Sequence, residues 1–532
     1  MLEELPSANS VAVTSSQVTP FGPIALSLSG GGYRAAAFHL GTMDMLYRLG
    51  LLPDVTALST VSGGTFTGMR YALSLKSRQT FRTFYDELKR DLETIDLPKL
   101  ALAKLTSGIP SIPSKRWDVI TAFAQVYDET LFAHKRFGVF WEGPDIPLTE
   151  LIFNSTEFRT AVAFRFRKSK SAKAKIGNGN VSITADQAKQ IRIADVVAAS
   201  SCFPGGFEPL SFPNDFQWPD DDAGRATLEE LRDKEWTPLP LMDGGVYDNQ
   251  GMGSLMLLDD DDDDKGLGDF GLFIFSDTDQ KRASLYTVPK PRAKGWLRLR
   301  HLNIIWWLLL FLSIGTLIVA VRFIAKPWYG WPGVLNLLPL VLASGTAIVL
   351  IWLRRKIKRA LCAIPQIGIG IWDFTKKLKV NQFIDLIELR ISSLFALAAG
   401  VFLRRIRRLV YDSIFGDQRF EARLLSNLIY DIPDAKPHAG PLDWLDPSEA
   451  MRDVAKAAND MPTTLWFTNT AQMPVLIACG QVTICHQLLD HILKLSGKDP
   501  RVIPPHLQPL FEQAQSLFLQ LKADPHAFVS AP

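Results

Sequence analysis

Two glycine-rich turns near the start of the chain carry residue types that suit acyl chemistry. The first turn reads Ser-Gly-Gly-Gly-Tyr-Arg at 29–34 and follows the apolar run Ile24–Leu28. Three consecutive glycines let the main chain approach a ligand closely. The helix expected at 35–49, with Gly50 as its C-cap residue, leaves free N–H groups at its N-terminus. Such a turn suits a developing oxyanion.

The second turn supplies a candidate nucleophile. Ser62 lies between a strand expected at 55–58 and a helix expected to begin near Thr65, so its hydroxyl would stand at the positive end of that helix. The usual pattern of such a turn is Gly-x-Ser-x-Gly. Here Thr60 takes the place of the first glycine, which requires a slightly more open turn, and Gly64 matches the second.

A third glycine-rich segment supplies a candidate base. Asp243 ends a short apolar run and is followed by Gly244 and Gly245. A carboxylate on such a sharp turn can reach another loop, so direct activation of Ser62 by Asp243 is plausible. Because Pro240 cannot donate a ladder hydrogen bond, the strand before Asp243 is expected to be short and to begin after Pro240.

Two other interpretations of these residues compete. The segment 30–35 also fits the Gly-x-Gly-x-x-Ala fingerprint of dinucleotide-binding proteins, with Asp54 as the ribose ligand, but that site gives Ser62 and Asp243 no role. A Ser-His-Asp triad would place its histidine after the acid. The histidines after Asp243 lie in no recognisable catalytic motif and are expected on the surface or on helix faces, and His39 is expected in a core or capping role. The histidines considered after Asp243 are His301, His438, His486 and His491.

The order of these motifs resembles the patatin-like phospholipase family, in particular its bacterial-type members. The resemblance rests on Gly-Gly-Gly-x-Arg, Ser-Gly-Gly and Asp-Gly-Gly, together with the segment 199–204, which is similar to a family stretch beneath the site. It covers roughly residues 21–280. The fold it implies is α/β, a patatin-like layered α/β hydrolase domain.

The resemblance also implies roles for individual residues. Ser62 and Asp243 would form a catalytic dyad that needs no histidine, and Gly30, Gly31 and Gly32 would form the oxyanion hole. Arg34 would either hold the glycine loop in shape or meet a phosphate, and Asn249 would keep a structural role although the family's following proline is missing. The remaining supporting residues are Gly63, Gly64, Gly244 and Gly245.

Two long apolar runs predict a transmembrane hairpin. Residues 304–321 and 334–353 contain no charge, and each can span a hydrocarbon core of about 30 Å at about 1.5 Å per residue. Arginine and lysine flank the outer ends of the pair, which favours a cytoplasmic position for these ends and for the catalytic domain, in a protein with two spans. The alternative is a pair of buried core helices.

The expected organisation has four parts. A leader at 1–20 precedes the catalytic domain at 21–290, in which strands at 24–28, 55–58, 161–167 and 272–276 alternate with helices. The hairpin occupies 291–360, as an inserted or appended element. A mainly helical C-terminal region without recognisable chemistry follows at 361–532. Residues 392–403 are too short for a span and fit a core or interfacial helix better.

Composition adds little beyond exclusions. The net charge is +3, and the four cysteines lack paired metal-ligand spacing. The acidic run at 259–264 lacks the spaced ligands of a calcium site and suits a solvated loop. A basic cluster at 404–408 fits either a solvated helix face or a binder of anionic headgroups. We therefore expect no metal, no cofactor and no nucleic-acid partner, and we leave a protein partner open.

These features predict a membrane-anchored serine hydrolase that cleaves fatty-acyl esters of lipids or phospholipids. Its partners would be a lipid substrate and the bilayer. The alternative is a catalytically silent patatin-like domain that serves as a lipid-binding scaffold or sensor at the membrane. A soluble hydrolase with a buried hairpin is a third possibility.

Overall fold

The computed structural model divides into two compact units, one of residues 1–283 and 398–532 and the other of residues 284–397. The structure describes residues 19–107, 118–171, 173–259, 270–279, 299–325, 345, 346, 348, 352, 379–438, 440–467, 469–497 and 499–530. Most of the leader, most of the acidic run at 259–264 and nearly all of the second predicted span lie outside these residues.

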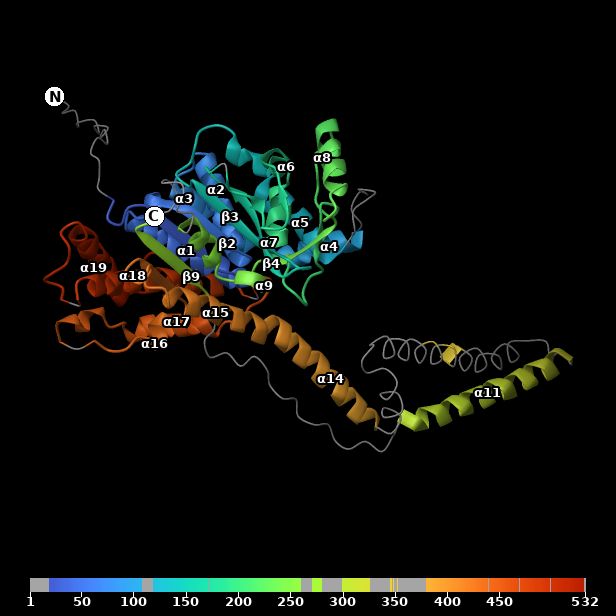
Figure 1. The fold of residues 1–532 in the computed structure, drawn as a ribbon. Helices are drawn as coiled ribbons and strands as arrows, with labels where there is room; N and C mark the ends of the chain where they lie inside the picture. Colours follow the sequence, from blue (N-terminus) through green and yellow to red (C-terminus); the bar gives the residue numbers. More distant parts are fainter. Residues whose placement is uncertain are drawn as a thin grey trace, which may run out of the picture. The chain divides into compact units, whose positions relative to one another are not determined.

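One mixed sheet organises the first unit (Figure 1). In the described part of the chain its main path runs β10-β9-β1-β2-β3-β4-β5-β6, and the strands from β10 to β3 are parallel. β4 pairs antiparallel with β3, as does β8, and β7 pairs with β8. The strands are β1 (Ile24–Leu28), β2 (Val55–Val61), β3 (Glu150–Glu157), β4 (Val162–Lys168), β5 (Ile176–Gly177), β6 (Ser182–Ile183), β7 (Leu210–Phe212), β8 (Leu239–Asp243), β9 (Leu272–Asp277) and β10 (Leu424–Leu428).

Alternating side chains of the central strands build two separate cores, as a layered α/β fold requires. In β9, Leu272 and Ile274 join the larger core, whereas Phe273 and Phe275 join the smaller one. The larger core includes α1 (Gly32–Arg48), α2 (Gly63–Lys76), α7 (Ile193–Ser201) and α18 (Gln472–Leu495). The smaller core includes residues of α10 (Met252–Asp259) and α15 (Phe402–Phe415). The predicted layered α/β class is confirmed.

Shorter elements complete the unit, and polar N-cap residues start several of them. The side chains of Thr80, Asp118, Asp221 and Ser448 each accept a hydrogen bond from a backbone N–H of the helix that follows, which satisfies a donor left free at a helix start. These elements are η1 (Leu52–Asp54), α3 (Phe81–Thr94), α4 (Leu97–Ser107), α5 (Val119–Tyr127), η2 (Asp128–Phe132), η3 (Phe137–Trp141), α6 (Ala185–Lys189), α8 (Asp222–Arg232), α9 (Gly245–Asp248), α16 (Asp431–Asp434), η5 (Gly440–Leu445), α17 (Glu449–Asp460) and α19 (Gln508–Ala523).

The predicted elements agree with the structure at most positions. β1 has the expected bounds, Gly50 adopts φ +72° after α1, and the Gly50 N–H donates to the Tyr47 carbonyl oxygen at 3.0 Å. The strand before Asp243 begins at Leu239, earlier than expected. Pro240 is tolerated there because its carbonyl oxygen still accepts from the Phe158 N–H at 2.8 Å.

Of the mainly helical C-terminal region expected at 361–532, residues 398–532 belong to the same compact unit as residues 1–283. β10 extends the sheet beside β9, and α18 packs along α1 (Figure 1). Among the described residues, α18 is the one helix long and apolar enough to cross a membrane, but 83% of its most apolar stretch is buried in the unit. Its burial identifies α18 as a core helix.

Two glycines allow the close contact between α1 and α18. A Cβ on Gly41 of α1 would collide with the Ile477 carbonyl oxygen, and a Cβ on Gly480 of α18 would collide with the Phe38 carbonyl oxygen. We expect Gly480→Ala to lower the stability of the protein by about 1–3 kcal/mol because the two helix backbones must move apart. The midpoint of chemical denaturation measures this loss.

A matched control for that substitution is Gly315→Ala in the other unit. Gly315 is also helical, but a Cβ there meets no atom of the described residues within 4 Å. Its substitution is expected to leave the midpoint unchanged. A Gly480→Ala protein as stable as wild type would contradict the close packing of α1 on α18.

The second unit contains the first predicted span. α11 (Leu299–Ala325) covers residues 304–321, and its described large apolar side chains from Trp307 to Ile324 are mostly exposed, Phe311 at 78%. The second predicted span, 334–353, is described only at four helical residues. The hairpin and its two-span orientation therefore remain predictions, and the apolar stretch of α11 among the described side chains, Trp307–Val321, is shorter than a full span.

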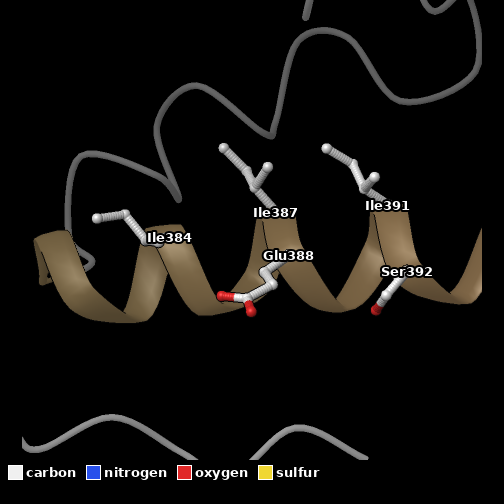
Figure 2. A pocket seen from close by; sticks show the side chains of 5 residues that line it. All are labelled: Ile384, Ile387, Glu388, Ile391 and Ser392. Atoms are coloured by element: carbon white, nitrogen blue, oxygen red, sulfur yellow. The ribbon is translucent and has the colours of Figure 1, made fainter. Parts of the chain in front are cut away.

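The same unit ends with an amphipathic helix, α14 (Val380–Ala396). Figure 2 shows Ile384, Ile387 and Ile391 pointing to the same side of α14, where they line a pocket with Glu388 and Ser392. α14, a π-helical turn at Leu397–Val401 and α15 follow one another in the chain. The segment 392–403 is thus part of these helices.

Candidate active site

The register of β3 brings the predicted nucleophile and base together. The last residue of β2, Val61, lies opposite Asn154, and Asp243 of the antiparallel strand β8 lies opposite the next residue, Ser155. β8 therefore lies beside β3 just beyond the end of β2. Ser62, which follows Val61, and Asp243 meet there, although 181 positions separate them in the chain.

The backbone at Ser62 has the geometry of a strained turn between a strand and a helix. Ser62 adopts φ +49° between β2 and α2, a conformation that residues other than glycine rarely take, and its side chain is nearly buried. Its N–H donates to the Ser200 hydroxyl at 3.0 Å, so the segment 199–204 lies beneath the turn as the resemblance implied. This bond helps to hold the unusual conformation.

Thr60 fits within this turn because neighbouring residues make room for it. Its hydroxyl lies 3.0 Å from the Thr65 hydroxyl, which in turn lies 2.8 Å from that of Ser200. Its methyl group occupies the space that a side chain at Gly68 of α2 would need. The missing first glycine of the usual pattern is therefore compensated by Gly68, one helical turn beyond Gly64.

The Asp243 carboxylate is buried and accepts a hydrogen bond within its own turn. The Gly245 N–H donates to its carboxylate at 2.7 Å, and the Ser62 side chain lies close enough to the same carboxylate to lower its pKa. Burial raises the pKa of Asp243 to about 6, and the interactions with Ser62 and Gly245 and the charge of Arg407 oppose this rise. A carboxylate with this pKa is ionised at neutral pH and more basic than an exposed one, which suits a general base.

The glycine loop lies against the Ser62 turn, but its three amides are not equivalent. The Gly30 N–H donates to the Asn249 carbonyl oxygen at 2.9 Å, whereas in the described structure the amides of Gly31 and Gly32 donate to no protein acceptor. Gly32 adopts φ +62°, and a Cβ on Gly63 would collide with the Gly32 carbonyl oxygen. Gly31 and Gly32 are therefore the two loop glycines whose N–H groups lack a protein acceptor among the described residues.

Arg34 holds the glycine loop in place. Its guanidinium donates to the Met461 carbonyl oxygen at 2.6 Å and to the Thr278 carbonyl oxygen, and the preceding Tyr33 donates to the Pro462 carbonyl oxygen at 3.2 Å. Arg34 is almost fully buried. Of the two roles expected for this residue, its contacts are those of a residue that fixes the loop.

The histidine alternatives find no support in the geometry. His39 is buried, and its ring nitrogens contact the Ser276 hydroxyl at 2.8 Å and the Ser29 carbonyl oxygen at 2.9 Å. Burial lowers the pKa of His39 to about 4, against the hydrogen bond to Ser29, so it is neutral and structural. The ionisable side chain that interacts with Ser62 among the described residues is the carboxylate of Asp243.

The dinucleotide interpretation is wrong for a topological reason. Asp54 lies in η1, immediately before β2 begins, whereas the glycine loop follows the end of β1. Because β1 and β2 are parallel, Asp54 lies at the amino ends of these strands and the glycine loop lies at their carboxyl ends. An acidic residue that binds the ribose would have to lie at the carboxyl ends of the strands, beside the glycines.

Sequence reasoning missed Arg407 of α15. It was grouped with Arg404, Arg405 and Arg408 as a basic cluster, yet its side chain is only 11% exposed and donates to the Gly30 carbonyl oxygen at 3.1 Å. No local pattern distinguishes Arg407 from its neighbours. Only the packing of α15 on the sheet places this one arginine beside the glycine loop.

A serine at positive φ beside a buried carboxylate, on a layered α/β fold, is typical of serine hydrolases. Residues 26–256, which include Ser62, Asp243 and the three loop glycines, match the family model of patatin-like phospholipases. We therefore identify this part of the chain as a patatin-like phospholipase domain. The resemblance expected from the motifs is confirmed.

Similarity to individual proteins is low. Human GIVD cytosolic phospholipase A2 is 16% identical with a TM-score of 0.24, over 44% of this chain, and the chain thus spans about two fifths (40%) of that protein. VipD from Legionella pneumophila is 12% identical with a TM-score of 0.22, over 95% of this chain and 93% of VipD. No curated protein matches the chain significantly.

Proposed function

We propose that this protein is a membrane-anchored serine lipid acyl hydrolase that uses a Ser62–Asp243 dyad. The observation that carries the proposal is the placement of Ser62, at a turn with positive φ, beside the buried carboxylate of Asp243, a placement that the register of β2 and β8 on β3 produces. Membership of residues 26–256 in the patatin-like phospholipase family supports an acyl ester of a lipid as the substrate.

In the proposed mechanism the Ser62 hydroxyl transfers its proton to Asp243 while its oxygen attacks the ester carbonyl carbon. The amides of Gly31 and Gly32 stabilise the resulting oxyanion. When the intermediate collapses, Asp243 returns the proton to the leaving alcohol oxygen and an acyl-Ser62 ester remains. Water then attacks this ester while Asp243 takes its proton, and Asp243 returns that proton to the Ser62 oxygen as the fatty acid leaves.

The exposed apolar surface of α11 supports the anchoring part of the proposal. Large apolar side chains stand on several sides of this 27-residue helix, and a helix that is apolar all round is normally buried in protein or lipid. An anchor would keep the site beside its substrate in the same bilayer. The second span and the cytoplasmic side of the catalytic domain belong to this proposal as well.

An active-serine probe tests the function directly. We expect a fluorophosphonate to label the detergent-solubilised protein at the peptide that contains Ser62, and the protein to release fatty acid from phospholipid or neutral-lipid vesicles. Absence of both reactions in protein that still binds vesicles would favour the silent lipid-binding scaffold instead. Extraction of the protein into buffer without detergent would contradict the anchored form.

A further inference from the structure

Arg407 reaches the candidate active site from outside the matched family segment. It lies on α15, 377 positions after Gly30 in the chain, and its Nη2 donates to the Gly30 carbonyl oxygen at 3.1 Å. The Asn249 side-chain amide, oriented so that its oxygen faces the guanidinium, accepts from Arg407 Nε at 2.6 Å. The Thr278 hydroxyl donates to the same Gly30 oxygen at 3.2 Å.

These contacts determine the direction of a neighbouring N–H group. The Gly30 carbonyl and the Gly31 N–H belong to one planar trans peptide unit, in which the two groups point in opposite directions. Donors that hold the Gly30 oxygen therefore also fix the Gly31 N–H, one of the two loop N–H groups that lack a protein acceptor among the described residues. Glycines on both sides of this peptide allow other rotations at low steric cost, so an external restraint is needed.

Acidic residues at the end of β9 hold the guanidinium in place. Asp279 lies 2.7 Å from Arg407 Nη1, and the buried Asp277 lies 3.6 Å from Nη2 and accepts from the Tyr411 hydroxyl at 3.0 Å. Burial lowers the pKa of Arg407, but the charges of Asp277 and Asp279 more than offset this effect and raise it. Arg407 is therefore a fixed positive charge at neutral pH.

That charge also acts on the candidate base. The titratable and polar groups that interact with the Asp243 carboxylate are the Ser62 side chain at the start of α2, the Gly245 N–H of α9, the Cys202 thiol after α7 and, through its charge, the Arg407 guanidinium of α15. Among them, Arg407 carries the one full positive charge, and it favours the ionised form of Asp243.

We propose that Arg407 is a positioning residue of the active site, which fixes the peptide between Gly30 and Gly31 so that the Gly31 N–H can serve the oxyanion. The assignment rests on the proposed function and adds to it a residue from α15. Arg407 contacts neither the substrate nor Ser62. It acts through the Gly30 carbonyl oxygen and through its charge near Asp243.

The test compares Arg407→Met with Arg408→Met in the full detergent-solubilised chain, with a short-chain p-nitrophenyl ester as substrate. Arg408 is the exposed neighbour on the same helix, so its loss changes the net charge equally. We expect Arg407→Met to lower kcat about 10²-fold with KM within about threefold of wild type. Arg408→Met should match wild type. Binding of a trifluoromethyl ketone, whose serine adduct carries an oxyanion, should weaken only in Arg407→Met.

Arg407→Lys separates the two effects of the side chain. Lysine keeps the positive charge but lacks the planar fork that reaches Gly30, Asn249 and Asp279 together, so kcat should stay low while the acidic limb of the pH profile stays at its wild-type position. In Arg407→Met that limb should move to higher pH, because the pKa of Asp243 rises. If Arg407 only stabilised the fold, its substitution would reduce the amount of folded enzyme without moving the acidic limb of the pH profile.

Equal kcat, inhibitor affinity and pH profile in Arg407→Met and Arg408→Met would overturn the assignment. If Arg407→Met does not fold, Asp279→Asn weakens the 2.7 Å ion pair instead and should lower kcat about tenfold, and full activity of that folded variant would overturn the assignment too. A wild-type protein without Ser62-dependent activity would overturn the proposed function and this assignment with it.

Discussion

Ser62→Ala is expected to lower kcat/KM for a short-chain ester by at least about 10⁴-fold, to the background of the assay. The substitution removes the oxygen that attacks the ester carbonyl, so no acyl-enzyme forms and no alcohol is released from the substrate. The loss is measured by ester hydrolysis and by labelling with a fluorophosphonate, and both signals should disappear together.

The fold should tolerate this substitution. The Ser62 N–H still donates to the Ser200 hydroxyl in the alanine variant, since that bond involves the backbone and not the Ser62 side chain. Ser77→Ala, at the other end of α2, serves as the control and should keep full activity. Esterase activity in Ser62→Ala above about a tenth of wild type would show that Ser62 is not the nucleophile.

Asp243→Asn should lower kcat/KM about 10³-fold or more, because the amide keeps the shape of the carboxylate but cannot accept the proton of Ser62. In the wild-type protein, kcat/KM should fall about tenfold per pH unit below about pH 6, where the carboxylate becomes protonated. Above about pH 7 it should reach a plateau. The variant should lack this limb.

Stability should change in the opposite direction from activity. The pKa of Asp243 is higher in the folded than in the unfolded chain, so the folded state keeps this proton between about pH 3.8 and 6, and the contribution of Asp243 to stability falls as pH rises through that window. Above pH 7 the buried charge costs stability, so Asp243→Asn should melt at the same or a higher temperature than wild type. Asp186→Asn, an exposed aspartate of α6, is the control for both measurements.

An active Asp243→Asn enzyme with an unchanged acidic limb would mean that another group accepts the proton. A variant that melts well below wild type at pH 8 would contradict the desolvated carboxylate that raises the pKa of Asp243. The two measurements therefore test the base and its environment separately.

Local patterns in the sequence were sufficient for the parts of the site that depend on neighbouring residues. β1 and the starts of β2 and β9 agree with their predicted positions because continuous apolar runs between turns are typical of buried parallel strands. Glycine spacing predicted the loop of residues 30–32 and the turn at Ser62, since only glycine or a strained residue fits such backbone geometry.

Other parts depend on residues far apart in the chain and had no local signal. The strand β3 was not predicted, although Val61 and Asp243 pair with consecutive residues of this strand, which brings them close together. The helix α18 resembles a membrane span by composition, and only its packing against α1 through Gly41 and Gly480 shows that it belongs to the core.

The sequence by itself determined the kind of chemistry: a serine turn, an aspartate turn and a glycine loop, each encoded within a few residues. Tertiary structure alone decided which of their atoms can act. It occupies the Gly30 N–H with the Asn249 carbonyl, leaves the N–H groups of Gly31 and Gly32 without an acceptor among the described residues, and brings Arg407 against the loop. The physical reason is that hydrogen-bond partners and burial depend on how distant segments pack, whereas turn geometry depends on the residues within the turn.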